Sequence, residues 1–341
     1  MKKILIICTG GTIASTEGGQ GLTPSLSATD ILSMVPELRD RVEAAVFPLM
    51  NIDSTNMRPE NWLTIAKTLE ERYDDYDGFV ILHGTDTMAY TAAALSYLCQ
   101  KLDKCVVLTG AQQPINLSYS DGRLNLLNAC TYAGDDWSHG VVTVFESRVI
   151  AGNRARKIKT HTYDAFESVN LPDIAAVLGS EVTHYLNPPK PTSGPHFYHE
   201  LKGRIFPMKL IPGLDASVFD MLYERYDAVI MESFGIGGIP EYVTDNESFA
   251  NAIGQWLSAG KTLVVTTQVP YEGSDFSVYK VGKHIKEKYH VLEAFDMSYE
   301  SIVTKLMWVL AQTNEQEEIC RLFYKPIGYD LIKWGCNNEM I

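Results

Sequence analysis

The sequence predicts an α/β protein with a larger N-terminal domain, whose mostly parallel sheet is covered by helices, and a smaller C-terminal α/β domain. Short apolar runs alternate with longer helical patterns, which is typical of parallel sheets. The chain has 341 residues, more than one hydrophobic core usually serves, so two domains are expected. A proline-rich segment that starts near residue 187 interrupts the alternation and separates the two parts.

The first half of the chain is expected to form the N-terminal domain. Apolar runs predict strands at residues 3–8, 45–50, 79–82, 105–109 and 141–146. Helical patterns predict helices at residues 59–73, 87–100 and 122–134. Pro59 stands at a favoured first helical position, and Ser120 and Asp121 offer a capping side chain before the third helix. The polar stretch 14–25 is expected to be a loop, either a mobile lid or a plain surface connection.

The segment 187–195 (NPPKPTSGP) has the composition of a linker, because its prolines cannot donate to a helix or a sheet ladder. We therefore place the N-terminal catalytic domain at residues 1–187, the linker at 188–205 and the C-terminal domain at 206–341. Beyond the linker the pattern predicts strands near 206–211, 227–231 and 262–267. It predicts helices near 216–225, 246–258 and 299–311.

Composition narrows the class of protein. The net charge of −13 argues against a nucleic-acid partner, which normally meets a basic face. The six cysteines form no C-x-x-C pair, and a chain this long needs no disulfide framework, so reduced thiols are expected. The apolar run 4–8 is too short for a signal peptide, and no run approaches a membrane span. We expect a cytoplasmic protein with no membrane partner.

Neither a metal nor a cofactor is expected. His196 and His199 form an H-x-x-H pattern, but it lies in the linker and lacks an acidic third ligand at a known spacing. The segment 9–12 (TGGT) follows a strand but has neither the spacing nor the lysine of a phosphate-binding loop, and it is not a G-x-G-x-x-G motif.

Two predicted strand ends carry threonine hydroxyls. The first is residues 9–12 with Thr12, and the second is residues 83–87 (HGTDT) with Thr85 and Asp86. Ligands bind at this edge of open α/β sheets, and threonine with aspartate in the absence of a serine elbow suggests hydrolysis through a threonine nucleophile. The alternatives are a simple turn at the first segment and a helix-capping role for Asp86 at the second. We expect His83 to have a structural hydrogen-bonding role.

Three further segments extend this candidate site. Residues 51–56 (NIDSTN) include Asp53, Ser54 and Thr55 and could hold a small zwitterion, although these residue types are also common in turns. Residues 109–114 (TGAQQP) follow another strand in the same way. Residues 152–159 offer a lysine to manage protons beside Asp86, but the pattern alone does not choose between Lys157 and Lys159.

Taken together, these segments resemble the bacterial-type L-asparaginases, in the cytoplasmic type I branch. Residues 9–14 and 77–88 are similar to the two signatures of that family. The resemblance covers essentially the whole chain and also includes residues 50–57, 152–157, 164–168 and 305–308. It implies hydrolysis of L-asparagine to L-aspartate and ammonia, and a homodimer or homotetramer.

The resemblance also implies residue roles. Thr12 corresponds to the nucleophile that forms a β-aspartyl ester, and Thr85, Asp86 and Lys157 correspond to the second catalytic group. Lys157 is chosen over Lys159 because it keeps the family's spacing from Arg154 and to Ser168. The substrate-binding positions implied are Asp53, Ser54, Thr55, Thr85, Asp86 and, through its backbone, Ala111.

One position departs from the family pattern. Many relatives carry a tyrosine in the loop after the first threonine, whereas Leu22 stands at the apparent position here. The activator of Thr12 is therefore open between Lys157 with Asp86, acting directly or through water, and the substrate's own groups. Two rival functions are the glutaminase subunit of a tRNA-dependent amidotransferase and an amino-acid-binding module without catalysis.

Overall fold

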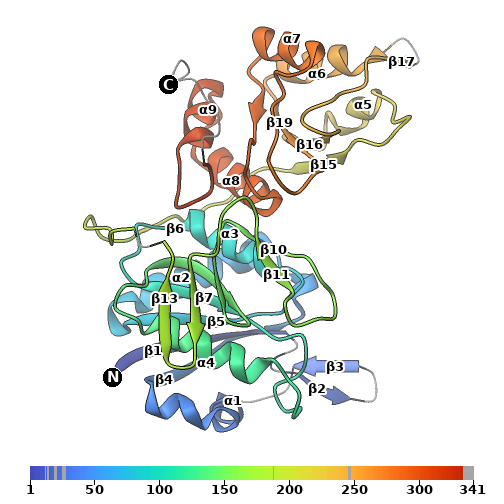
Figure 1. Ribbon diagram of the computed structural model, residues 1–341. Coiled ribbons are helices and arrows are strands. Elements are labelled where there is room, and N and C mark those ends of the chain that lie inside the picture. Colours follow the sequence, from blue (N-terminus) through green and yellow to red (C-terminus); the bar gives the residue numbers. More distant parts are fainter. Residues whose placement is uncertain are drawn as a thin grey trace. The chain divides into compact units, whose positions relative to one another are not determined.

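The computed structural model describes residues 1–11, 13, 15–18, 21–24, 28–186, 188–244 and 247–332 (Figure 1). Thr12 and Asn187, to which roles or boundaries were assigned above, lie outside these described residues. The chain divides into two compact units, Met1–His199 and Glu200–Ile341, and each unit is considered by itself.

The N-terminal unit is built on an eight-stranded sheet with the strand order β13-β12-β9-β8-β7-β5-β1-β4. Five strands run parallel: β4 (Val42–Ile52), β1 (Lys2–Gly10), β5 (Gly78–Leu82), β7 (Cys105–Thr109) and β8 (Gly140–Phe145). Three antiparallel strands extend one edge: β9 (Arg148–Ala151), β12 (Ala175–Leu178) and β13 (Glu181–His184). The apolar runs of β5 and β7 are buried along their whole length, as expected for central parallel strands.

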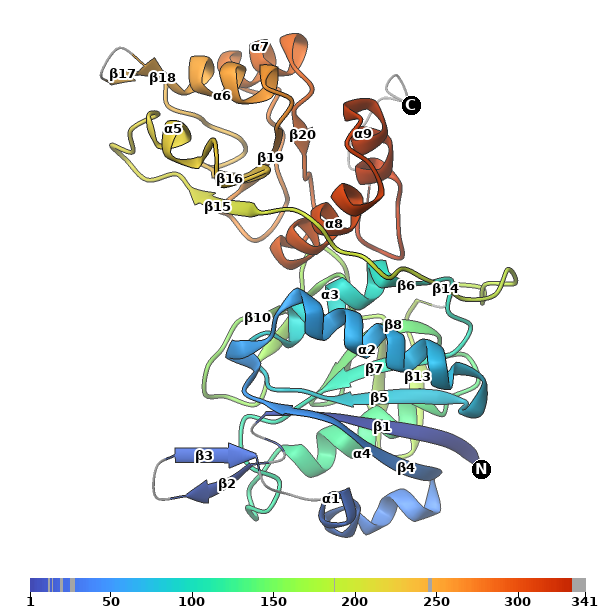
Figure 2. The same ribbon diagram turned by 180° about the vertical axis from the view of Figure 1, so that it is seen from behind.

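Helices cover both faces of this sheet (Figures 1 and 2). α2 (Pro59–Arg72) and α3 (Met88–Leu98) lie on one face, and α1 (Ala28–Met34) and α4 (Gly122–Ala133) lie on the other. α2 begins at Pro59, as its sequence predicts, because the fixed φ of proline suits the first helical turn. Short 3₁₀ helices at Pro36–Asp40, Ser54–Asn56 and Tyr73–Asp75 add to these layers.

Two-stranded ladders lie outside the main sheet of this unit. β2 (Ser15–Gly18) pairs with β3 (Gly21–Pro24), so the stretch expected to be a loop contains a β-hairpin. The two strands form because the inward-facing backbone groups of each pair with those of the other, which does not require an apolar stretch. β10 (Ala155–Lys157) pairs with β11 (Phe166–Ser168), and β6 (Cys99–Gln100) pairs with β14 (His196–Phe197) just after the proline-rich segment.

The C-terminal unit has a smaller parallel sheet of four strands: β15 (Ile205–Lys209), β16 (Ala228–Ser233), β19 (Thr262–Thr267) and β20 (Leu292–Glu293). α5 (Val218–Leu222), α6 (Phe249–Ser258) and α7 (Lys280–Lys288) lie on one side, and α8 (Tyr299–Gln312) and α9 (Gln316–Tyr324) lie on the other (Figures 1 and 2). A short ladder joins β17 (Val243–Thr244) to β18 (Glu247–Ser248). The predicted fold class is thus confirmed in both units.

The segment 305–308, which contributed to the family resemblance, lies in α8. Its lysine makes contacts inside the C-terminal unit. The Lys305 ammonium is fully buried and donates to Asp330 Oδ2 at 2.6 Å and to the Lys325 carbonyl at 2.9 Å. Burial lowers the pKa of Lys305, whereas the Asp330 carboxylate opposes that change. This lysine therefore ties α8 to the chain that follows α9.

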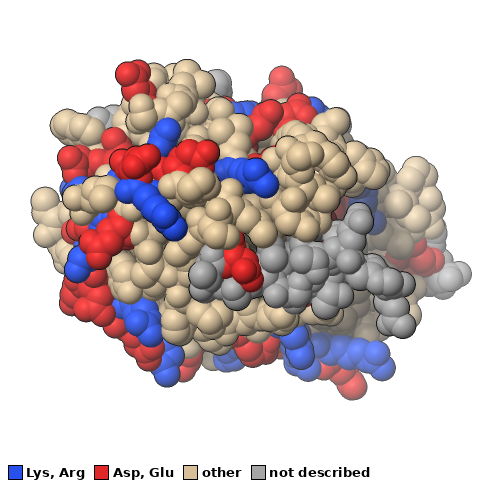
Figure 3. All heavy atoms as spheres, turned by 90° about the horizontal axis from the view of Figure 1, so that it is seen from below, with Lys and Arg blue, Asp and Glu red and all other residues tan. Residues whose placement is uncertain are grey.

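Charge is distributed without one dominant patch on the face shown in Figure 3, where Lys and Arg side chains lie interspersed with Asp and Glu. Within the described ranges, no helix has the length and the apolar character needed to cross a membrane.

Candidate active site

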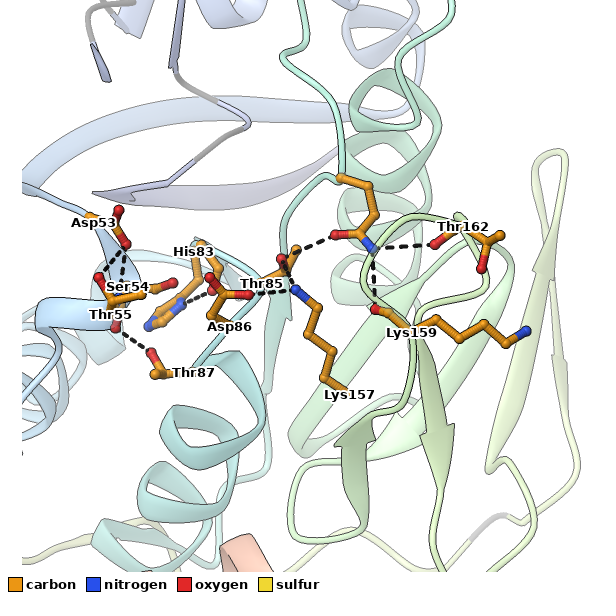
Figure 4. Close-up of polar contacts among 12 residues, drawn as sticks. Asp53, Ser54, Thr55, His83, Thr85, Asp86, Thr87, Lys157, Lys159 and Thr162 are labelled. Carbon is orange, nitrogen blue, oxygen red and sulfur yellow. Dashed lines mark hydrogen bonds and ion pairs between the residues drawn. The ribbon is translucent and has the colours of Figure 1, made fainter. Parts of the chain in front are cut away.

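Thr85, Asp86 and Lys157 meet beyond the carboxyl end of β5 (Figure 4). Thr85 and Asp86 lie in the short connection between β5 and α3, and Lys157 ends β10. Lys157 Nζ donates to Thr85 Oγ1 at 2.8 Å and to Asp86 Oδ1 at 2.6 Å. Thr85 is buried, the Lys157 side chain is 16% exposed, and Asp86 is 58% exposed, so the cluster is covered on one side and open at the carboxylate.

The structure separates the two candidate lysines. The Lys159 ammonium pairs with Asp164 instead, and both side chains are about half exposed. The capping alternative for Asp86 is not observed, because Thr87 is the N-cap residue of α3. The Thr87 hydroxyl donates to the Ser54 carbonyl at 2.7 Å. Of the two lysines, Lys157 is the one in contact with Thr85 and Asp86.

Gln112 is part of the cluster and was missed as a site residue. Thr85 Oγ1, which accepts from Lys157, donates to Gln112 Oε1 at 3.2 Å. Gln112 Nε2 donates to the carbonyls of Lys159 at 3.4 Å and Thr162 at 3.3 Å. The amide thus connects Thr85 to the chain after β10. The one sequence signal was its place beside Ala111 at a strand end, where an amide can both accept and donate.

The segment that carries Asp53, Ser54 and Thr55 begins a 3₁₀ helix after β4. Asp53 Oδ1 accepts from the Thr55 backbone N–H and from Thr55 Oγ1, both at 2.9 Å. Asp53 and Thr55 are exposed, while Ser54 is buried. A Cβ on Gly84 would lie 2.6 Å from Ser54 Oγ, so a glycine is needed where this segment meets the β5–α3 connection.

Gly10 and Gly11 allow β1 to end in close contact with its neighbours. Their φ angles are +109° and +83°, and a Cβ on Gly11 would lie 2.4 Å from the Gly84 backbone nitrogen. A Cβ on Gly10 would lie 2.3 Å from the Ile52 carbonyl oxygen. These positions require glycine both for conformation and for space. They bring the residue before Thr12 against the residue before Thr85.

His83 has the structural role that its position predicts. It is fully buried, and burial lowers its pKa to about 4, so the ring is neutral near pH 7. Nδ1 lies 2.7 Å from the Gly84 carbonyl oxygen and must donate to it, so Nε2 is an acceptor. The Thr91 hydroxyl, 2.9 Å away, therefore donates to Nε2, and Trp62 Nε1 donates to Thr91 at 3.0 Å.

Two further observations concern the part of the chain that the structure describes. There, no group of three or more His, Cys, Asp or Glu side chains is arranged to hold a metal ion. Five cysteines fall within the described residues, and all five are free thiols.

Two protein families match the chain in sequence. The N-terminal asparaginase family matches residues 3–190, and the glutaminase/asparaginase C-terminal domain matches residues 204–323. The chain is 37% identical over 330 residues to an L-asparaginase of Thermococcus kodakarensis, with 96% of this chain and 99% of that protein covered. It is 36% identical to L-asparaginase 1 of Escherichia coli K12, with 93% and 94% covered.

Structural similarity agrees with these matches. The solved structure of the thermostable L-asparaginase from Thermococcus kodakarensis has a TM-score of 0.91 and 36% identity, covering 97% of this chain and 100% of that one. A probable cytoplasmic L-asparaginase from Campylobacter jejuni has a TM-score of 0.80 at 25% identity, with 96% and 100% covered. The chain is also 33% identical to a glutamyl-tRNA(Gln) amidotransferase subunit of Metallosphaera sedula, with 94% of this chain and 74% of that protein covered.

Proposed function

This chain belongs to the asparaginase family of hydrolases, and on that premise we propose that it hydrolyses L-asparagine to L-aspartate and ammonia in the cytoplasm. The observation that carries the proposal is the contact of Lys157 Nζ with both Thr85 Oγ1 and Asp86 Oδ1. A cation, a hydroxyl and a carboxylate in contact can move protons to and from a reacting amide.

In the proposed reaction, the Thr12 hydroxyl attacks the β-carbonyl carbon and gives up its proton. The carbon–nitrogen bond of the side-chain amide then breaks, and the –NH₂ group takes up that proton and leaves as ammonia. Water then hydrolyses the β-aspartyl ester and releases L-aspartate. A threonine hydroxyl is a weak nucleophile at neutral pH, so the first step needs a proton acceptor. We assign proton transfer to Thr85, Asp86 and Lys157. Leu22 cannot replace a loop phenol, so Lys157 with Asp86 or the substrate's own groups must activate Thr12.

Substrate binding is assigned to the polar groups around this cluster. The Asp86 carboxylate is more than half exposed and would hold the α-ammonium group of the substrate. The neighbouring segment with Asp53, Ser54 and Thr55 would bind the substrate's other polar groups, and the Ala111 backbone would meet the side-chain amide. Backbone N–H groups that stabilise the developing oxyanion are typically worth about 10²–10³ in rate each.

L-glutamine is expected to be a slower substrate. It differs from L-asparagine by one methylene, and packing discriminates one methylene by only about 10- to 200-fold. Steady-state kinetics with both amides over a wide concentration range measures this ratio directly.

The decisive test is the ammonia release of Thr12→Ala compared with that of the wild type. We expect turnover of L-asparagine to be abolished, because the covalent step loses its nucleophile. Thr64→Ala on α2 is the matched control, since its hydroxyl donates only to the Glu60 carbonyl one turn away. If Thr12→Ala keeps near wild-type activity, Thr12 is not the nucleophile.

The amidotransferase relative supports a second candidate, a glutaminase subunit that works with a partner. Ammonia release from L-glutamine that appears only when a partner protein is added would favour it. Tight binding of L-asparagine with no hydrolysis would instead favour an amino-acid-binding module.

A further inference from the structure

Two buried side chains at the start of α4 hold the loop that follows β7. The Asp121 carboxylate accepts from the Gln112 N–H at 2.9 and 3.1 Å, through its two oxygens, and from the Gln113 N–H at 3.1 Å. Asn125 Nδ2 donates to the Gly110 carbonyl at 3.0 Å and to Asp121 Oδ2 at 3.1 Å. The loop from Gly110 to Gln113 is therefore bound on both sides of Ala111.

The Asp121 side chain accepts hydrogen bonds from this loop and not from the N–H groups of its own helix. It occupies the N-cap position of α4, where an aspartate normally accepts from helical N–H groups, yet its side chain makes no capping hydrogen bond. Ser120 Oγ accepts from the Gly122 N–H at 3.0 Å in its place. Asn125 is fully buried, and its Oδ1 accepts from the Glu146 N–H at 2.8 Å, so its amide is anchored at both ends.

This arrangement determines the direction of the Ala111 carbonyl. The peptide bond between Ala111 and Gln112 is trans, so its N–H and C=O point in opposite directions. Because the Gln112 N–H points at Asp121, the Ala111 carbonyl points away from it. The loop also meets the catalytic cluster, since Gln112 Oε1 accepts from Thr85 and a Cβ on Gly110 would lie 3.5 Å from Thr85 Cγ2.

Among the described residues, none donates a hydrogen bond to the Ala111 carbonyl, although Ala111 is only 1% exposed. A buried carbonyl without a donor is unfavourable, and a donor supplied by a ligand would remove that cost. A carbonyl accepts only, so it suits the –NH₂ of a carboxamide and not the ionised carboxylate that the reaction leaves.

We propose that Asp121 and Asn125 are positioning residues that aim the Ala111 carbonyl at the side-chain amide of the substrate, so that the site prefers the amide over the product acid. The inference rests on the proposed function and adds the residues responsible for this selectivity. Neither side chain touches the substrate. Both act through the backbone between Gly110 and Gln113.

The test compares Asp121→Asn with the wild type in two measurements, kcat/KM for L-asparagine and the inhibition constant of L-aspartate. Asparagine keeps the shape of the side chain but places an –NH₂ group against the N–H groups that Asp121 binds. We expect kcat/KM for L-asparagine to fall about 10- to 100-fold, the range for losing a charge-assisted hydrogen bond. The inhibition constant of L-aspartate is expected to stay within about threefold, because the carboxylate donates nothing to Ala111.

Asp135→Asn is the matched control at the other end of α4. Asp135 also accepts from two backbone N–H groups, those of Trp137 and Ser138, both at 3.0 Å, but it holds a different loop. We expect both constants to stay within about threefold of wild type. If circular dichroism shows that Asp121→Asn does not fold, the same two constants are measured for Asp121→Glu. That variant keeps the charge and displaces the carboxylate oxygens by one methylene.

The outcomes separate this inference from the proposed function. The positioning role is wrong if, in the Asp121 variant, kcat/KM for L-asparagine falls and the inhibition constant of L-aspartate rises by the same factor. It is also wrong if kcat/KM is unchanged. In both cases the proposed function stands. If the wild type releases ammonia from neither amide, the proposed function itself is wrong.

Discussion

Lys157 is the cation on which the proposed proton transfer depends, and its two contacts separate it from Lys159. We expect Lys157→Met, which keeps the apolar stem, to lower kcat/KM for L-asparagine by about 10²–10⁴, the usual contribution of a general acid or base. Its free energy of unfolding is expected to change by less than about 1 kcal/mol, because the Asp86 partner is largely exposed. Ammonia release and urea unfolding measure the two effects.

Lys159→Met is the control for that prediction. The change removes a surface ion pair with Asp164 but keeps the Lys159 carbonyl that accepts from Gln112. Activity is expected to stay within about threefold of wild type. If Lys157→Met and Lys159→Met lose activity equally, Lys157 does not have the proton-transfer role assigned to it.

At this scale the sequence identifies residue types but not contacts. Residue patterns alone left Lys157 and Lys159 equivalent, because both follow Arg154 within a few positions. The choice depends on pairing between β10 and β11, which brings the end of β10 to Thr85. Gln112 and Asp121 were missed as site residues for the same reason, since their roles arise from contacts with distant backbone groups.

Among secondary-structure elements, the connection after β5 is held to two helices by His83. Its ring links the Gly84 carbonyl to Thr91 of α3, and Thr91 accepts from Trp62 of α2. Protonation of His83 would place a hydrogen on Nε2, so Nε2 could no longer accept the hydrogen bond that the Thr91 hydroxyl donates. The position of Gly84, against which Gly11 packs, therefore depends on a neutral imidazole.

This buried ring predicts a pH dependence of stability. Burial lowers the pKa of His83 to about 4, below the value of about 6.5 in an unfolded chain, so the unfolded state binds the proton more tightly. Its contribution to the free energy of unfolding is fully present above about pH 6.5 and is lost as the pH falls through 4. The total is about 3 kcal/mol. Urea unfolding of wild type and His83→Asn at pH 7, 6, 5 and 4 measures the difference in slope.

The asparagine side chain of that variant would keep a donor for the Gly84 carbonyl and cannot titrate, so the variant should have a shallower decline than the wild type on the acid side. His290→Gln removes an exposed histidine and leaves His83 in place, which makes it the control. Parallel pH profiles for wild type and His83→Asn would show that His83 does not carry this dependence.

The elements that could be predicted are those with strong local patterns. The buried runs of β1, β5, β7 and β8 and the helices α2, α4 and α8 lie close to their expected bounds. The hairpin of β2 and β3 and the antiparallel strands β9, β12 and β13 were not predicted, because they are short, partly polar and depend on tertiary pairing. The helix expected near 216–225 is only the five residues of α5, with turns on either side.

For the whole molecule, the two α/β units and their sheets follow from the alternation of patterns along the chain, whereas assembly does not. The groups that we propose bind the substrate are open within one chain, since Asp86 is 58% exposed and Asp53 and Thr55 are exposed. Exposed carboxylates hold ligands weakly because water screens them. A second copy that covers these groups would strengthen their interactions, which supports the homodimer or homotetramer implied by the family.

We therefore expect light scattering after size-exclusion chromatography to give two or four times 38.0 kDa. Activity per chain should fall when the protein is diluted below its dissociation constant. Because each chain carries a net charge of −13, copies repel at long range, and raising the ionic strength from about 0.01 M to 0.15 M shortens the screening length from about 30 to 8 Å. Association should strengthen over that change. A monomer of 38.0 kDa with full activity at every salt concentration would contradict the assembly.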